Sequence, residues 1–142
     1  MSVNDLGAHG PATATALAAS PTIHIVDMSD NNLGEHAPAT ATALAASFTI
    51  HPVVMSGNSL GAHGPATATA LAASPVIHTV DMSENYLGIN ELATATVFAD
   101  YNQYVADLIE LTHLICIEGH PICDELVDII CSYLDVPIHF TL

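Results

Sequence analysis

The strongest constraint on this chain is a repeat with a constant period. The heptapeptide Met-Ser-x-Asn-x-Leu-Gly begins at Met1, Met28, Met55 and Met82, so its copies are evenly spaced along the sequence. A unit that runs from one of these methionines to the next is too short to fold alone, and it becomes stable only when neighbouring units stack and share a core. Each recurring residue then forms a column through the stack. The chain is therefore expected to fold as stacked coils. Positions within a repeat are numbered from its methionine, which is position 1.

Each repeat carries signals for one helix and one strand. A proline at position 11 favours the first turn of a helix, because its ring fixes φ and its missing N–H is not needed there. The Ala-rich stretch that follows has high helix propensity apart from its threonines, and it ends at a serine at position 20. The segment Ile23 to Met28 and its copies from Ile50 and Ile77 are β-branched and bounded by turn residues, which predicts short strands.

The repeat resembles a leucine-rich repeat of the ribonuclease-inhibitor subtype. The run Ile23-x-x-Val26-x-Met28-x-x-Asn31-x-Leu33-Gly34 is similar to the family pattern L-x-x-L-x-L-x-x-N-x-L, and the match recurs at Ile50 to Gly61 and at Ile77 to Gly88. The resemblance implies an α/β solenoid with short parallel strands on the concave face and helices on the convex face. It implies about five coils in one domain, residues 1–142, with near-identical repeats at 1–27, 28–54 and 55–81 and divergent repeats at 82–142.

The last third of the chain follows the repeat less closely. Apolar residues from Val97 to Ile109 recur at helical spacing, which predicts a longer helix. Residues 111–122 are predicted to form the next strand and turn, and apolar residues between Leu126 and Leu134 predict another amphipathic helix. A last strand is expected at 138–142.

The charge balance excludes several classes of partner. All 15 charged residues are acidic, and the chain contains no lysine or arginine. Nothing in it can neutralise phosphates or an anionic leaflet, so nucleic acid and membranes are not expected as partners. A basic protein, a divalent cation or a neutral surface stays open.

The sequence also suggests a compartment. No apolar run is long enough to span a bilayer, and no signal peptide is visible. The cysteines, Cys116, Cys123 and Cys131, are odd in number and clustered, which favours free thiols in a reducing compartment over a disulfide framework. A soluble cytoplasmic protein is expected.

Two kinds of column in the expected stack concern function. The asparagine at position 4 is assigned a structural role, because a buried amide can satisfy loop N–H and C=O groups. Histidines form one column at His24, His51 and His78, with His139 as an outlying copy, and a second at His9, His36 and His63. Three interpretations stay open for them: harmless copies of one residue, a pH-dependent role, or a zinc or copper site assisted by Asp27 and Asp81.

Other motifs are set aside. The residue types of His113-x-x-Cys116-x-x-x-His120-x-x-Cys123 suit zinc, but an odd spacing on a predicted strand would put His113 and Cys116 on opposite faces. The Thr-x-Thr pairs resemble ice-binding arrays, yet they fall on predicted helices, where residues two apart diverge. No phosphate loop or nucleophile elbow is visible, so no enzyme, cofactor or metal is expected.

These observations favour a protein-interaction scaffold. Its partner is expected to be a protein, with a basic surface, that binds the concave sheet face. The candidate partner-binding residues are His24, Ile25, Asp27, His51, Val54, His78, Thr79 and Asp81. Two alternatives stay open: end-to-end self-association through uncapped coil ends, and a metal- or pH-responsive histidine ladder.

Overall fold

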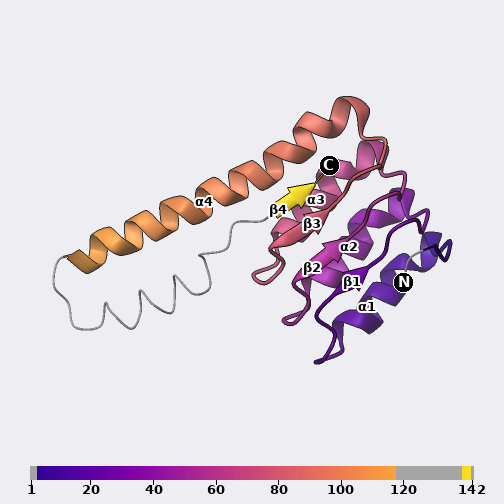
Figure 1. Ribbon diagram of the computed structural model, residues 1–142, viewed down its shortest axis with the longest axis horizontal. Coiled ribbons are helices and arrows are strands. Elements are labelled where there is room, and N and C mark those ends of the chain that lie inside the picture. The colour runs from indigo at the N-terminus through magenta and orange to yellow at the C-terminus, as the bar shows by residue number, and fades with distance from the viewer. Residues whose placement is uncertain (1–2, 118–138, 142) are drawn as a thin grey trace.

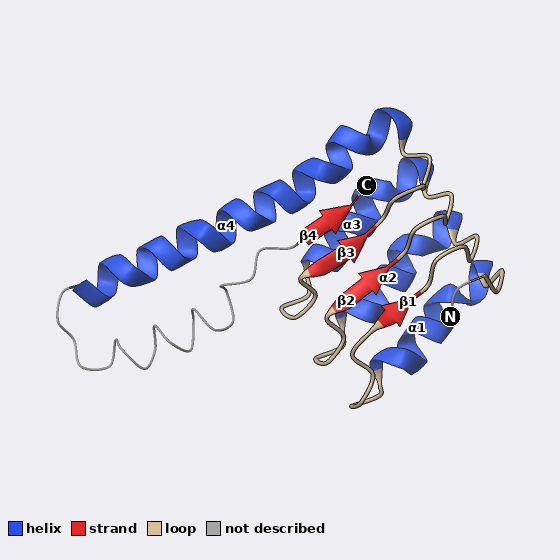
Figure 2. Cartoon of the chain, viewed as in Figure 1, coloured by secondary structure: helices blue, strands red, loops and turns tan. Residues whose placement is uncertain are grey.

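A computed structural model describes residues 3–117 and 139–141 of the chain. It is an α/β structure in which helices pack behind one parallel sheet (Figures 1 and 2). Within these residues, no helix combines the length and the apolarity needed to cross a membrane.

Each of the first three repeats forms a turn, a short helix and a strand. The helices are α1 (Gly10–Ala18), α2 (Ala37–Ala45) and α3 (Gly64–Ala72), and each carries a proline in its first turn as predicted. A 3-10 helix precedes each one: η1 (Gly7–His9), η2 (Gly34–His36) and η3 (Gly61–His63). The strands are β1 (Val26–Asp27), β2 (Pro52–Val54) and β3 (Thr79–Asp81). Pro52 is the first residue of its strand, where a missing N–H is tolerated.

The fourth repeat opens in the same way and then departs from the pattern. After η4 (Gly88–Asn90) comes α4 (Glu91–Ile117), which has 27 residues against nine in each earlier helix. Strand β4 (His139–Thr141) lies beside β3 and confirms the strand expected near the end of the chain.

The register of the sheet reproduces the repeat. Val26 pairs with Val53 and Val53 with Val80, which are the same position of successive repeats, and all pairs are parallel. From Val80 the next partner is Phe140, so about two repeat lengths of chain lie between β3 and β4. A layer is defined here as one strand together with the turn and the helix that follow it.

The expected strand at residues 111–122 is wrong for residues 111–117, which continue α4. The β-branched residues of this segment suggested a strand. However, no proline or glycine stands between the start of α4 at Glu91 and Gly119, and a helix once formed extends cooperatively. Because the sheet order is β1-β2-β3-β4, no strand lies between β3 and β4, and the expected five coils reduce to four strands in the described part. Residues 118–138, including the helix predicted near 126–134, lie outside the described residues.

The core lies between the helices and the sheet. Val26, Val53 and Val80 point into it from the strands and are at most 3% exposed. Methionine at position 1 and leucine at positions 6 and 17 join them in the interior of the stack. The buried members, each at most 7% exposed, are Met28, Met55, Met82, Leu33, Leu60, Leu87, Leu44 and Leu71. In the first repeat Leu6 and Leu17 are only half-buried, and so is Ile23, the counterpart of the buried Ile50 and Ile77.

The asparagine column ties successive turns together, as predicted. Asn58 is fully buried, its Oδ1 accepts from the Asn31 N–H at 3.0 Å, and its Nδ2 donates to the carbonyls of Met28 and Met55. Asn31 and Asn85 form equivalent bonds one turn earlier and one turn later. The turns also place non-glycine residues at positive φ at positions 3 and 5, for example Asp30 (52°) and Asn32 (53°), which the sequence analysis did not predict.

Candidate functional site

Eight residues were predicted to form a partner-binding face, and the structure brings them together on the side of the sheet opposite the helices. Asp27, Val54 and Asp81 are side by side in register. Two residues earlier in the strands, Thr79 pairs with Pro52, and Ile25 holds the same position of the first repeat. Ile25 and Thr79 are both exposed, Ile25 by 70%. His24, His51 and His78 lie next to them. We call these eight residues and Pro52 the sheet face.

The three histidines of the sheet face form a stack. The ring centroids of His24 and His51 are 5.9 Å apart with an angle of 12° between the planes, and those of His51 and His78 are 5.4 Å apart at 23°. His24 Nδ1 lies 3.0 Å from the Thr49 carbonyl oxygen. A carbonyl only accepts, so Nδ1 carries the proton, and Nε2 of the neutral ring is an acceptor. The column thus has a structural role, joining neighbouring layers.

The other histidines occupy different places. His139 was expected to be an outlying copy in this column, but it pairs with Thr79, one position out of register with His78, so that prediction is wrong. His9, His36 and His63 each end a 3-10 helix, away from the sheet. His36 Nε2 lies 3.9 Å from Glu35 Oε1.

The two aspartates of the sheet face each brace a strand exit. Asp27 Oδ1 accepts hydrogen bonds from the backbone N–H and the hydroxyl of Ser29, at 2.9 and 2.6 Å. Ser83 makes the same pair of bonds to Asp81. The hydroxyl and amide of Ser29 hold the pKa of the Asp27 carboxyl below its ordinary value of 3.8. Both carboxylates are thus fixed in position and remain partly accessible.

The His-Cys motif at residues 113–123 begins on a helix and not on the strand that was expected. His113 and Cys116 both lie in α4, so the argument from strand alternation is wrong, while His120 and Cys123 lie outside the described residues. Across residues 3–117 and 139–141, no three His, Cys, Asp or Glu side chains are grouped so that they could hold a metal ion. The Thr-x-Thr pairs lie on helices as predicted, and Thr42 Oγ1 donates back to the Pro38 carbonyl.

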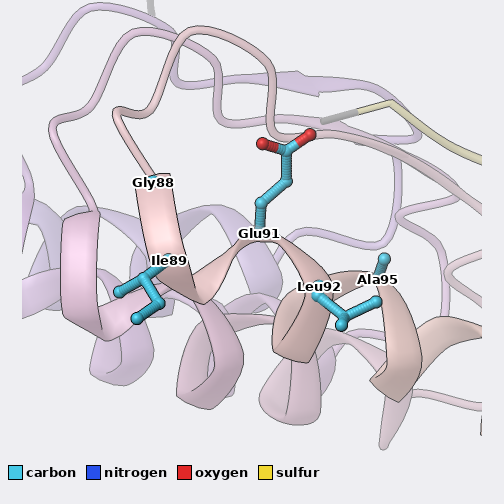
Figure 3. Close-up of a pocket in the computed structure, with 5 residues that line it drawn as sticks. All are labelled: Gly88, Ile89, Glu91, Leu92 and Ala95. Atoms are coloured by element: carbon cyan, nitrogen blue, oxygen red, sulfur yellow. The ribbon is translucent and has the colours of Figure 1, made fainter.

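Sequence reasoning missed a hollow beside the fourth turn. It has a volume of about 400 Å³ and is lined by Gly88, Ile89, Glu91, Leu92 and Ala95 (Figure 3). Ile89 is 97% exposed and Leu92 78%. The signal was in the repeat itself, because position 8 holds Ala, Glu and Ala in the first three repeats and isoleucine in the fourth.

Comparisons with protein-family models, curated proteins and solved structures found no match to this chain. The functional argument therefore depends on the residues and their geometry.

Proposed function

We propose that the chain is a leucine-rich-repeat solenoid that acts as a non-enzymatic scaffold and binds a basic protein segment on its sheet face. The observation that carries this proposal is the set of exposed columns on the strands, one apolar or neutral and one partly acidic. Each column runs across the sheet, because the strands pair in register and every repeat adds one residue to it. Neighbouring strands lie about 4.8 Å apart, so the residues of one column suit a partner that also runs across the strands.

The chemistry of the face favours a basic and partly apolar partner. Ile25, Pro52 and Val54 offer apolar contact at its centre. Asp27 and Asp81 offer two oriented carboxylates, and the chain has no lysine or arginine of its own to pair with them. Oppositely charged partners are steered towards such a surface, and exclusion of water at the centre strengthens the charge-assisted contacts.

A selection experiment tests the proposal while the partner is unidentified. The full chain is immobilised and used to select binders from a library of random displayed peptides, and the enriched peptides are synthesised. We expect enrichment of Lys or Arg together with apolar residues, and an affinity that falls as salt rises. Enrichment of acidic peptides, or an affinity independent of salt, contradicts the proposal.

Matched charge variants locate the binding. Asp27→Asn with Asp81→Asn keeps the Oδ1 acceptor that each serine uses but removes two charges from the sheet face. We expect the Kd of a selected peptide to rise about tenfold at low salt. Glu35→Gln with Asp100→Asn removes two charges from exposed positions on η2 and α4, and should change the Kd by less than about twofold. Equal effects of the two pairs contradict the assignment.

The histidine stack favours a second candidate, a pH-responsive form of the same binder. Protonation would place like charges on rings 5.4 to 5.9 Å apart, next to Asp27 and Asp81. Because positive charge on these rings would repel a basic peptide, such a peptide should bind less tightly at about pH 5.5 than at about pH 7.5. The variant His51→Gln should reduce this pH dependence, and an unchanged pH profile in the variant contradicts the candidate.

A cytoplasmic location is part of the proposal, supported by the odd number of cysteines.

A further inference from the structure

Successive layers touch most closely at position 10 of the repeat. This position is Gly10 in the first repeat, and a Cβ placed there would lie 2.5 Å from Leu33 Cδ2 and 2.7 Å from Thr40 Oγ1 of the next layer. Gly64 meets Leu87 and Thr94 in the same way. Ala37 occupies the position in the second repeat and is fully buried. A following layer therefore requires a residue no larger than alanine at position 10.

The fourth repeat breaks this requirement. Its position 10 is Glu91, the first residue of α4, and it is exposed. Figure 3 shows its carboxylate extending away from Ile89 and Leu92, on the rim of the hollow. A standard repeat laid over the fourth turn would bring its Leu at position 6 and its Thr at position 13 onto this side chain.

Otherwise the fourth turn is ready to receive another layer. In the earlier turns, the N–H groups at positions 3, 4 and 7 donate to the next turn, as Asp30, Asn31 and Gly34 do to the third turn. The same N–H groups of Glu84, Asn85 and Gly88 have no acceptor within the described residues. Their backbone has the same conformation, with positive φ at Glu84 (57°), Tyr86 (53°) and Gly88 (53°).

The surface that would complement the fourth turn is present at the other end of the described stack. The first turn has the same sequence pattern, and Val3, Asp5 and Gly7 have the same positive φ. Its apolar residues Leu6 and Leu17 are half-buried, whereas their counterparts Leu33 and Leu44 are fully buried under a preceding layer. An amide oxygen has two lone pairs, so Asn4 can accept a bond from a preceding turn alongside any others that it forms.

We propose that the fourth turn is a docking surface for the first turn and α1 of a second copy of this chain, and that Glu91 keeps it closed. Docking would place the first turn of the second copy in the layer of β4, because the Met82 N–H already donates to the Thr141 carbonyl of that layer. The contact is head-to-tail, so once opened it would add copies without limit. The bulk of the glutamate beyond Cβ prevents this, and its charge adds a desolvation cost.

Substitution of Glu91 tests the proposal by sedimentation over a range of concentrations. The unaltered chain should stay at 14.7 kDa. Glu91→Gly and Glu91→Ala restore residues found at this position in other repeats, and their weight-average mass should rise with concentration to at least about twice that value. Far-UV circular dichroism and a cooperative melt separate assembly of folded chains from misfolding. Assembly of the unaltered chain, or monomeric and folded Glu91→Gly and Glu91→Ala variants, overturns the proposal.

Two controls separate size from charge. Asp100→Ala also removes one carboxylate from α4 and restores the alanine of position 19, an exposed position, so it should remain monomeric. Glu91→Gln keeps the size of the side chain without its charge and should also remain monomeric. Assembly of either control to the same extent as Glu91→Gly contradicts closure by the Glu91 side chain.

Mixing tests the polarity of the contact. The unaltered chain has an intact first turn but a closed fourth turn, so it can add to the open end of a Glu91→Gly assembly and then stop its growth. An excess of unaltered chain should therefore convert the assemblies into one-to-one dimers, detectable by native mass spectrometry with an isotope-labelled copy. Assemblies that ignore the added chain contradict a head-to-tail contact.

Discussion

The first three repeats and the fourth differ in what they leave for a neighbour. In the first three, position 10 is glycine or alanine, the helix ends after nine residues, and the next layer covers the core. In the fourth, position 10 is Glu91, the helix runs for 27 residues, and apolar side chains such as Ile89 remain on the surface. The regular repeats thus determine how layers stack, whereas the departures determine where stacking stops.

The largest effect is expected when the glutamate of the fourth repeat is placed at position 10 of the third repeat. Gly64→Glu puts a charged side chain under Leu87 and Thr94, which already lie within 2.8 Å of where a Cβ would stand. We expect a loss of about 4 kcal/mol or more in the free energy of unfolding, measured by urea denaturation, because overpacking and a buried unpaired charge act together.

A matched variant uses the neighbouring repeat position that tolerates glutamate. Ala62→Glu places the same side chain at position 8, where Glu35 already stands in the second repeat and both residues are exposed. Its effect should be within about 0.5 kcal/mol. Similar losses for Gly64→Glu and Ala62→Glu would show that position 10 is not a close contact between layers.

Within the first three repeats, the asparagine column is expected to contribute more to stability than exposed turn residues do. Asn58→Ala removes a side-chain acceptor from the buried N–H groups of Asn31 and Leu33. It also removes one amide donor from the carbonyls of Met28 and Met55, each of which keeps a bond from a neighbouring asparagine. We expect a loss of about 3 kcal/mol in the free energy of unfolding. Asn32→Ser, at an exposed position of the preceding turn where the third repeat has Ser59 at the same positive φ, should cost about 0.5 kcal/mol or less. A cost for Asn58→Ala no larger than this would contradict the ladder.

The smallest expected effect compares strand exits with and without an aspartate. Ser29→Ala removes the hydroxyl that donates to the Asp27 carboxylate and leaves the backbone N–H bond, so the pKa of Asp27 should rise towards 3.8, as followed by NMR titration. Because the folded-state pKa is lowered, this bond stabilises the fold above about pH 3.8, and its contribution is lost as the pH falls through the folded-state pKa.

The stability cost of Ser29→Ala at neutral pH should be about 1 kcal/mol and should shrink in acid. Ser56→Ala is the control, since Val54 stands where the other repeats have aspartate. A cost of Ser29→Ala that does not change with pH, or an equal pH dependence in Ser56→Ala, would contradict the assignment.

Much of the fold could be predicted because the repeat encodes it several times over. The prolines place the helices, the β-branched segments place three strands, and the period gives their register. The asparagine column followed from the need to satisfy loop N–H groups, and its bonds are present. Positions 25 and 27 of the sheet face were expected to be accessible, and alternate strand positions do point away from a core that holds Val26, Val53 and Val80.

The remainder escaped because the signals were single rather than repeated. The strand expected at residues 111–117 rested on local β-propensity alone, which the continuing helix overrides. The misplacement of His139 came from counting one repeat onward from a strand at Leu111, a residue that lies in α4. Glu91 was visible in the sequence against Gly10, Ala37 and Gly64, but its importance depends on how closely layers approach.

Mapping a selected basic peptide onto the chain by NMR tests the central functional claim most directly. As the peptide is added, we expect the largest amide shifts on the sheet face, at Ile25, Asp27, Val54, Thr79 and Asp81, with little change on the exposed sides of α1 to α3. Shifts concentrated on the helices, with the strand amides unchanged, would contradict binding at the sheet face.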